Sequence, residues 1–162
     1  MHTVIFCAGG WSYPRLTDLT ADGIRTEIDL NLVSALLVLR EAARRVTDGG
    51  RVVLLSSAAA VVAPARQSVY AAAKAGLEAA TRVAAKELAP RGITVNAVRP
   101  GATDTPTLRA GTSERAIESM ARANAMQRLG TPDDVAGVVA MFLTPDAAWL
   151  TGTVLDATGG LL

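Results

Sequence analysis

The chain has 162 residues, half of them hydrophobic, and its sixteen basic and fifteen acidic side chains leave a formal net charge of +1. This length suits one domain with a sizeable core, and the apolar content excludes a disordered chain. Because neither sign of charge gathers into a long run, the composition argues against nucleic acid and anionic membranes and favours a small-molecule partner.

The sequence also gives no sign of export or membrane insertion. Its one cysteine, Cys7, cannot form an internal disulfide, and the short apolar stretch at the start lacks a basic lead-in. The apolar stretch "LVSALLVL" is closed by Arg40 and Glu41, and no apolar run approaches the roughly 18 residues of a membrane span. We therefore expect a cytoplasmic protein.

The first half of the chain alternates strand and helix patterns. "TVIFCA" (3–8) is a continuous apolar run typical of a strand buried on both faces. Apolar residues then recur every three or four positions over 21–46, which predicts a long helix. "GRVVLLSS" (50–57) predicts a second buried strand, and the Ala-rich segment 68–89 a second long helix that ends at "PRG".

The second half continues the pattern. "GITVNAVRPG" (92–101) predicts a third strand that runs into a Pro-Gly turn, followed by a loop over 102–112 and a short helix over 113–126. "TPDDVAGVVAMFLT" opens with Thr131 as an N-cap and Pro132 at the first helical position. "TGTVLDATGG" (151–160) predicts a fourth strand. Such alternation predicts a single α/β domain over 1–162, with about four parallel strands, flanking helices and right-handed crossovers.

The candidate chemistry lies between residues 57 and 74. Tyr70 and Lys74 are four residues apart on a predicted helix, so both side chains lie on one face. A nearby ammonium favours a phenolate, and we expect Lys74 to lower the pKa of Tyr70 from about 10 toward neutrality. Ser57 closes a buried strand, where ligands of parallel sheets collect. Each has a plainer interpretation, a surface pair for Tyr70 and Lys74 and a strand-ending hydroxyl for Ser57.

Several segments in order resemble the short-chain dehydrogenase/reductase family over nearly the whole chain. They are "CAGG", "DLNL", "GRVVLLSSAAA", "YAAAKAGLEAATRVAAKELAPRGITVNAVRPGATDTP", "RLGTPDDVAGVVAMFL" and "LTGTVLDATGG". The resemblance implies a Rossmann-like doubly wound sheet and oxidation of an alcohol or reduction of a carbonyl with NAD(P)(H). Cys7 and Thr158 stand where the family usually has asparagine and aspartate.

The resemblance also implies roles for individual residues. Ser57, Tyr70 and Lys74 match the family's catalytic positions, and Asn31 matches the fourth catalytic residue, which supports a proton-relay water. Without the resemblance, the plain interpretation of Asn31 is a buried residue that bonds the backbone at a helix kink. The cofactor-binding set that the family implies comprises Ala8, Gly9, Tyr70, Lys74, Pro100, Gly101, Thr103 and Thr105, with no metal. Within it, Thr105 is expected to bind the nicotinamide carboxamide.

The family's first strand, its Gly-rich turn and its next two strands have no counterpart in these residues. We therefore expect a truncated Rossmann-like sheet that corresponds to the C-terminal two-thirds of the family fold and binds a dinucleotide weakly. The strand at 3–8 should be an edge that invites pairing with another chain. We expect a homo-oligomer formed through helices 21–46 and 68–89, and possibly through strand 3–8.

Three functions remain open on the sequence. The first is an NAD(P)(H)-dependent oxidoreductase of this family. The second is an enzyme that uses the same acid/base residues without redox chemistry, as an isomerase, dehydratase or cyclase. The third is a catalytically silent relative that binds a partner through its helical surface. The complete set Asn31, Ser57, Tyr70 and Lys74 favours an enzyme.

Overall fold

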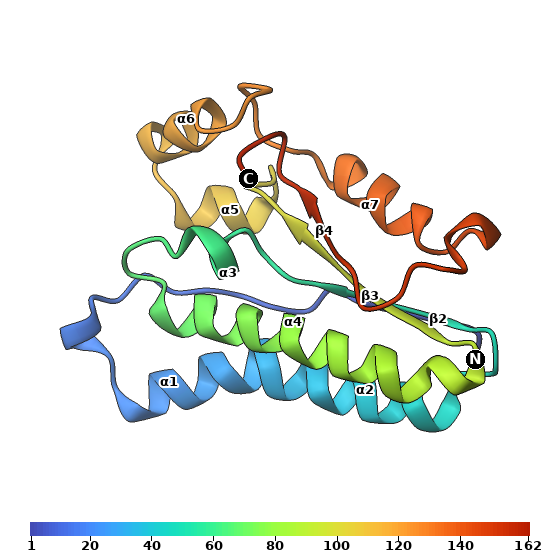
Figure 1. Cartoon of the computed structure of the whole chain (residues 1–162). Helices are drawn as coiled ribbons and strands as arrows, with labels where there is room; N and C mark the ends of the chain where they lie inside the picture. The colour runs from blue at the N-terminus through green and yellow to red at the C-terminus, as the bar shows by residue number, and fades with distance from the viewer.

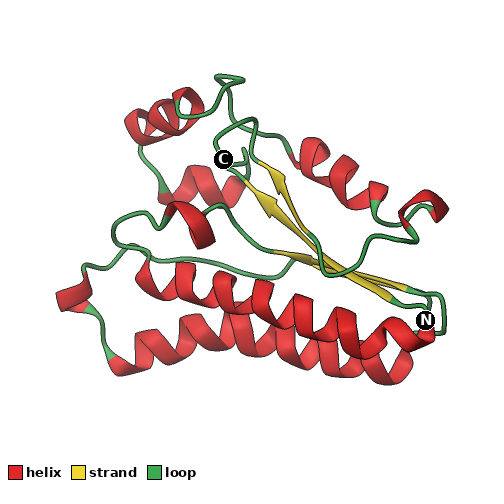
Figure 2. Cartoon of the chain, viewed as in Figure 1, coloured by secondary structure: helices red, strands yellow, loops and turns green.

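The computed structural model describes residues 1–162 and contains one sheet of four parallel strands in the order β1-β2-β3-β4. The strands are β1 (Thr3–Phe6), β2 (Arg51–Leu55), β3 (Thr94–Pro100) and β4 (Val154–Ala157). The register aligns Val4 with Val52 and Val52 with Val95. The α/β class and the parallel four-stranded sheet predicted from the sequence are confirmed (Figures 1 and 2).

Helices cover both faces of this sheet. In Figure 1, α1, α2 and α4 lie below it and α7 above it, while α5 and α6 lie beyond the carboxyl ends of β3 and β4. The helices are α1 (Ala21–Ile28), a π-helical turn (Asp29–Val33), α2 (Ser34–Arg45), α3 (Ala59–Val62), α4 (Ser68–Leu88), α5 (Pro106–Gly111), α6 (Glu114–Arg122) and α7 (Pro132–Met141), with 3-10 turns at Leu16–Asp18, Ala89–Arg91 and Pro145–Ala147. None of them is long and apolar enough to cross a membrane.

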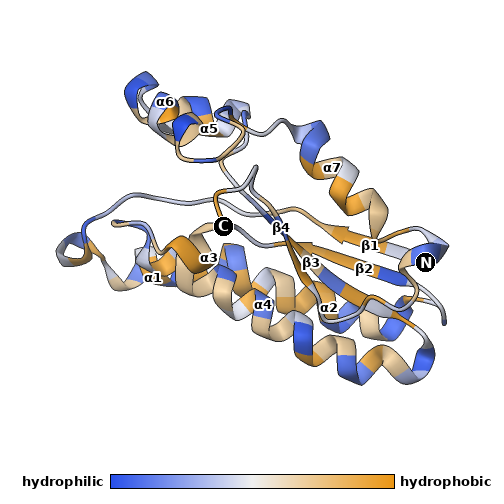
Figure 3. Cartoon of the chain, turned by 45° about the horizontal axis from the view of Figure 1, so that its top comes forward, coloured by the Kyte–Doolittle hydropathy of each residue, from blue (hydrophilic) through white to orange (hydrophobic).

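The two-sided burial follows from alternation within the strands. Val52 and Leu54 face the layer of α2 and α4, where they join a buried cluster with Leu39 and Leu77. Val53 points the other way and packs with Phe142 behind α7. Because successive side chains of a strand point to opposite faces, the aliphatic run "RVVLL" requires cover on both sides. Figure 3 shows this run of β2 as mostly hydrophobic.

The crossover between β3 and β4 differs from the expectation of uniformly right-handed connections. All three connections step in the same direction across the sheet, yet α2 and α4 lie on one face and α7 on the other. The last connection must therefore have the opposite hand to the first two. The handedness rule describes direct crossovers, whereas this one first passes through α5 and α6 beyond the strand ends. Apolar residues of β2 and β3 on the second face are then buried by α7.

Other differences are local. The predicted helix 21–46 is continuous from Ala21 to Arg45 but contains the π-helical turn at Asp29–Val33. The predicted loop 102–112 contains α5, which Thr105 caps by accepting a hydrogen bond from the backbone N–H of Leu108 at 3.2 Å. Propensity gave no signal for so short a helix, because its stability comes from capping and from the burial of Leu108.

Strand β1 is an edge, as the sequence predicts. It pairs with β2 alone, and Ile5 on the α7 side is 46% exposed while Phe6 on the other side is buried against α2. The backbone groups along the outer side of β1 have no strand partner. This side of the sheet is thus open to pairing.

A partly buried cluster of charges joins α4 to the two last strands. Arg99 of β3 donates two hydrogen bonds to Glu78 of α4, at 2.9 and 2.8 Å, and one to Asp156 of β4 at 2.5 Å. Ser56, which follows β2, donates to the same Glu78 carboxylate at 2.6 Å. Burial would raise the pKa of Glu78, but the hydrogen bonds from Arg99 and Ser56 outweigh it and lower the pKa.

We predict that Glu78→Ala lowers the free energy of unfolding by about 3–5 kcal/mol, because Arg99 would lose its main buried partner. Urea denaturation at pH 7 measures the loss. The matched control is Asp22→Ala, which removes an exposed pair with Arg25 and should cost at most about 1 kcal/mol.

The same prediction has a pH dependence. Glu78 has a folded-state pKa below its ordinary value of 4.5, so its contribution is complete above pH 4.5 and is lost as the pH falls through the folded value. The stability gap between the native chain and Glu78→Ala should shrink in that acid range. A gap that stays constant down to the lowest pH at which the fold persists would contradict this assignment.

Candidate active site

The π-helical turn places Asn31 beneath the segment that follows β1. Its amide nitrogen donates to the carbonyls of Gly10 at 2.7 Å and Glu27 at 2.9 Å, and its oxygen accepts from the Gly10 N–H at 3.2 Å. Asn31 is completely buried. It fixes both backbone groups of Gly10, and so it positions the turn at the carboxyl end of β1.

Gly9 lies in close contact with two predicted site residues. A Cβ atom at this position would be 2.9 Å from the Asn31 amide oxygen and 3.2 Å from the Lys74 ammonium. The turn can approach Lys74 this closely only with glycine at the position. Asn31, Gly9 and Lys74 therefore meet at one point, although they come from three separate segments.

Helix α4 holds the carboxyl end of β2 through two successive turns. Lys74 donates from Nζ to the Leu55 carbonyl at 2.9 Å, and one turn later Glu78 accepts the Ser56 hydroxyl at 2.6 Å. Lys74 is only 3% exposed, and burial lowers its pKa from 10.5 to about 8. These contacts fix the strand end that carries Ser57.

Ser57 and Tyr70 are the candidate reactive residues of the site. The Ser57 hydroxyl oxygen accepts the Ala59 N–H at 3.2 Å, and the hydroxyl lies within hydrogen-bonding reach of Tyr70. Burial raises the pKa of Tyr70, and the hydrogen-bonded Ser57 hydroxyl opposes that rise. The expectation that Lys74 brings the pKa of Tyr70 toward neutrality is thus wrong for this structure. Desolvation of the phenolate dominates, while Lys74 Nζ lies 5.7 Å from the ring centroid and binds a backbone carbonyl.

The third side of the site is the loop after β3. A Cβ atom on Gly101 would lie 3.1 Å from the Thr158 Cα, so a side chain at this position would push the end of β4 outward by a few tenths of an ångström. Thr103 donates to the Gly101 carbonyl at 3.0 Å, and Thr105 caps α5. Pro100 ends β3, directly before Gly101.

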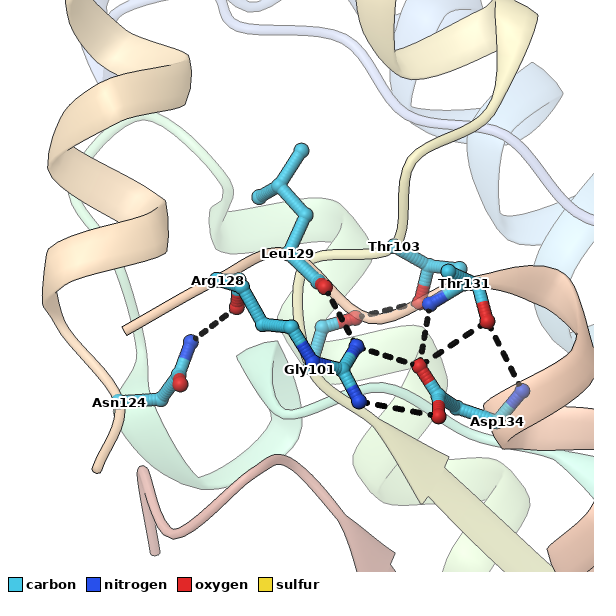
Figure 4. A network of polar contacts seen from close by, with 7 residues as sticks. All are labelled: Gly101, Thr103, Asn124, Arg128, Leu129, Thr131 and Asp134. Atoms are coloured by element: carbon cyan, nitrogen blue, oxygen red, sulfur yellow. Dashed lines mark hydrogen bonds and ion pairs between the residues drawn. The ribbon is translucent and has the colours of Figure 1, made fainter. Parts of the chain in front are cut away.

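Hydrogen bonds and an ion pair join the two ends of the segment that carries α5 and α6, between β3 and α7 (Figure 4). We call these contacts the clamp. Thr103 and Gly130 form a parallel bridge, in which Asp104 N–H donates to the Gly130 carbonyl at 2.8 Å. Arg128 binds Asp134 through two hydrogen bonds of 2.6 and 3.1 Å, and Thr131 and Asp134 form a reciprocal capping box at the start of α7. The Thr131 N-cap predicted from the sequence is confirmed. The clamp fixes the point at which the segment with α5 and α6 leaves β3 and the point at which it continues into α7.

These elements enclose a cavity of about 960 Å³ at the carboxyl ends of β1, β2 and β3. Of the ten predicted site residues, the cavity is lined by Gly9, Ser57, Tyr70, Lys74, Pro100, Gly101, Thr103 and Thr105, whereas Ala8 and Asn31 lie outside the lining. Asn31 acts from below, through Gly10. The structure therefore brings eight predicted residues, from segments far apart in sequence, to one site.

Sequence reasoning missed part of this cavity. Trp11 and Tyr13 line it from the loop after β1, and Val135, Val139 and Leu143 line it from α7 and its C-terminal end. The position of Trp11, directly after "CAGG", was a usable signal, because a segment next to a cofactor turn must lie near the reacting atoms. The sequence could not show that residues of α7 line the cavity, because the face of the sheet that α7 covers depends on the hand of the last crossover.

Comparison with known proteins agrees with this architecture. Residues 1–162 match the protein family described as enoyl-(acyl carrier protein) reductase. A short-chain type dehydrogenase/reductase from Picea abies is 35% identical over 164 residues, which cover 99% of this chain and 60% of the relative. The structure of the angucycline C-6 ketoreductase LanV with bound NADP superposes with a TM-score of 0.94 at 27% identity, covering 100% of this chain and 63% of LanV.

A second solved structure is more similar in sequence. The promiscuous reductase LugOII, which catalyses a keto-reduction at C1 during lugdunomycin biosynthesis, has a TM-score of 0.90 and 35% identity, and covers 100% of this chain and 64% of LugOII. The chain thus spans about three fifths of the length of the curated relatives that it matches.

We predict that the Lys74 amine titrates near pH 8, because the buried ammonium is poorly solvated. NMR titration of lysine-labelled protein measures this, and Lys74→Met identifies the signal by removing it. Between the folded value of about 8 and the unfolded value of 10.5 the unfolded chain binds more protons, so this group makes stability rise with pH across that window. A Lys74 signal that titrates at or above pH 10.5 would contradict the burial.

Proposed function

Because the chain belongs to the short-chain dehydrogenase/reductase family, we propose that it reduces a carbonyl, or oxidises the corresponding alcohol, with a nicotinamide cofactor. The observation that carries this proposal is the convergence of Ser57, Tyr70 and Lys74 on one cavity at the carboxyl ends of the strands. Its relatives include oxidoreductases, among them the NADP-bound ketoreductase LanV and the reductase LugOII.

The residues present fit the nicotinamide end of NAD(P)(H). Lys74 has donor capacity beyond its bond to Leu55, Tyr70 and Ser57 offer hydroxyls, and the backbone turns at Gly9 and Gly101 allow close approach. We propose that Gly9, Tyr70, Lys74, Pro100, Gly101, Thr103 and Thr105 hold this end, with Ala8 preceding the turn. Bound there, the cofactor supplies or accepts a hydride.

Tyr70 is the proposed acid. Burial keeps the pKa of its phenol above the ordinary value, so at neutral pH the hydroxyl carries a proton that it can donate to a carbonyl oxygen as negative charge develops there. Ser57 orients that oxygen: its own oxygen accepts from the Ala59 N–H, and its hydroxyl, which lies beside the Tyr70 phenol, can donate to a substrate oxygen bound there. The protonated phenol suits carbonyl reduction better than the reverse direction.

Lys74 and Asn31 support the acid. After Tyr70 has donated its proton, the ammonium of Lys74, 5.7 Å from the ring centroid, stabilises the resulting phenolate. With a pKa of about 8, Lys74 is charged at pH 7 and close enough to neutrality to pass a proton on. Asn31 positions the Gly10 turn above it and supports the proton path.

We predict that Tyr70→Phe lowers kcat by about 10²–10⁴-fold, because the proton donor is removed while the ring and its packing remain. Lys74→Met should cost a similar factor. The matched control is Lys86→Met on the same helix, whose exposed side chain lies outside the cavity and whose loss should leave turnover unchanged. Turnover is measured by NADPH or NADH absorbance with a ketone panel, and undiminished activity of Tyr70→Phe would contradict the proposal.

We further propose that the chain forms a homo-oligomer through the outer face of α1, α2 and α4. The inner face of the long helix is buried at Ala35, Leu39 and Ala42, whereas its outer face exposes large apolar side chains. These are Ile24, Leu30, Val33, Leu36 and Leu37, with Val83 on α4. Several large exposed apolar side chains on one helical layer are typical of an association surface.

We predict a dimer or larger species in light scattering at micromolar concentration. Val33→Glu combined with Leu37→Glu should shift the chain toward monomer, because two charges would be buried in the contact without partners. Leu16→Glu, a change at an exposed side chain on a separate 3-10 turn, serves as the control and should leave the mass unchanged. A native chain that is monomeric throughout the micromolar range would contradict the proposal.

A further inference from the structure

The loop that follows β1 presents two aromatic side chains to the cavity. Trp11 and Tyr13 line it, while Ser12 between them faces α1 and binds Glu27 through its backbone N–H at 3.1 Å and its hydroxyl at 2.9 Å. Alternate residues of an extended segment point in opposite directions. The Glu27 anchor on one side of the loop therefore fixes an aromatic wall on the other.

Hydrogen bonds hold the loop that carries this wall at three positions. Asn31 fixes Gly10, Glu27 fixes Ser12, and Arg66 donates to the Tyr13 carbonyl at 2.8 Å. Glu27 is 9% exposed and Asn31 is fully buried, so both anchors belong to the packed interior. Arg66 adopts a left-handed backbone with φ of 69°, a conformation uncommon outside glycine. A prearranged wall loses little conformational entropy when a ligand binds.

Trp11 lies beside the reacting group. Its ring centroid is 6.1 Å from that of Tyr70, with the planes tilted by 55°, a distance at which aromatic rings attract each other. A flat ring system packed against Trp11 would therefore lie close to the Tyr70 ring. The exposed face of the indole selects ligands by ring shape.

The scarcity of charged side chains in the cavity further restricts the class of ligand that it can bind. Lys74 is the one charged side chain among its 33 lining residues, and 20 of these residues are hydrophobic. Lys74 is itself bound to the Leu55 carbonyl. The apolar lining beyond the loop comes from Val62, Leu108 and Met120 on α3, α5 and α6. A carboxylate or phosphate on the substrate would find no second cation there and would lose its hydration.

We infer that Trp11 determines specificity and that the substrate is an uncharged carbonyl compound with a flat, apolar ring system, a refinement that rests on the proposed carbonyl reduction. The ring packs against Trp11 and Tyr13, and the carbonyl oxygen reaches Ser57 and Tyr70. The volume of about 960 Å³ is at the upper end for small-molecule sites, so two or more fused rings fit beside a nicotinamide.

Binding without cofactor tests this inference separately from catalysis. In a Trp149→Phe background, which removes the 97% exposed second tryptophan, Trp11 is the only indole and its fluorescence reports occupancy. The probes are 1-tetralone, an uncharged bicyclic ketone, and its charged counterpart 5-oxo-5,6,7,8-tetrahydronaphthalene-2-carboxylate. We expect 1-tetralone to quench Trp11 and to bind at least tenfold more tightly than the carboxylate.

Calorimetry with the variants completes the test. Trp11→Ala should weaken 1-tetralone binding by about tenfold, whereas Trp11→Phe, which keeps an aromatic face, should retain most of it. Circular dichroism confirms that each variant is folded. Equal affinity for the two probes, or unchanged binding in Trp11→Ala, would overturn the inference. Trp11-dependent binding together with full turnover in Tyr70→Phe would leave the wall intact and refute the proposed acid instead.

Discussion

The hold of α4 on the carboxyl end of β2 is the constraint on which the rest of the site depends. Lys74 binds the last carbonyl of the strand and Glu78 binds the next hydroxyl, at 2.9 and 2.6 Å. Since α4 also carries Tyr70, one turn before Lys74, the helix fixes the phenol and the strand end with Ser57 relative to each other. Glu78 is fixed in turn by Arg99, which ties the same helix to β3 and, through Asp156, to β4. The charge cluster and the candidate reactive residues are therefore held in place by the same helix, α4.

Burial of Lys74 has a cost that function accounts for. An amine that is 3% exposed, and whose pKa falls to about 8, is poorly solvated in its charged form, and aliphatic packing would be more stable there. Strongly shifted groups gathered in a cleft are typical of functional sites. Tyr70 shows the complementary effect, because burial raises its pKa and keeps it protonated. Desolvation thus shifts the pKa of both groups, and in the proposed mechanism it prepares Tyr70 as the proton donor and Lys74 as the charge beside it.

Much of the fold was predictable because the signals are local. The aliphatic runs in β2 and β3, the three- and four-residue spacing of apolar positions in the first long helix and the Thr131 N-cap each depend on neighbouring residues. The catalytic set Ser57, Tyr70 and Lys74 could be proposed because ordered motifs resemble the family, whereas the four-residue spacing of Tyr70 and Lys74 alone also fits a surface pair; the structure brings the three residues to one cavity. What could not be predicted depends on packing between distant segments: the hand of the last crossover, the short helix α5, and the cavity wall of Trp11 and α7. The raised pKa of Tyr70 could not be predicted either. The four-residue spacing shows only that an ammonium is nearby, whereas the desolvation that raises the pKa depends on tertiary burial.

The contacts that shape the reacting end are all formed within these 162 residues. Asn31 holds Gly10, Lys74 holds Leu55, and a Gly101 without a side chain lets β3 close against Thr158. A diphosphate is usually held at the N-terminus of a helix that follows a Gly-rich turn, but α1 begins only at Ala21, long after β1, and α3 is four residues long. In the proposed mechanism, the contacts of Asn31 and Lys74 hold the groups for proton transfer in place without a bound diphosphate. Under the proposed function, the aromatic wall and the hydroxyls would orient the substrate, because hydrogen bonds with Asn31, Glu27 and Arg66 already hold the loop that carries the wall.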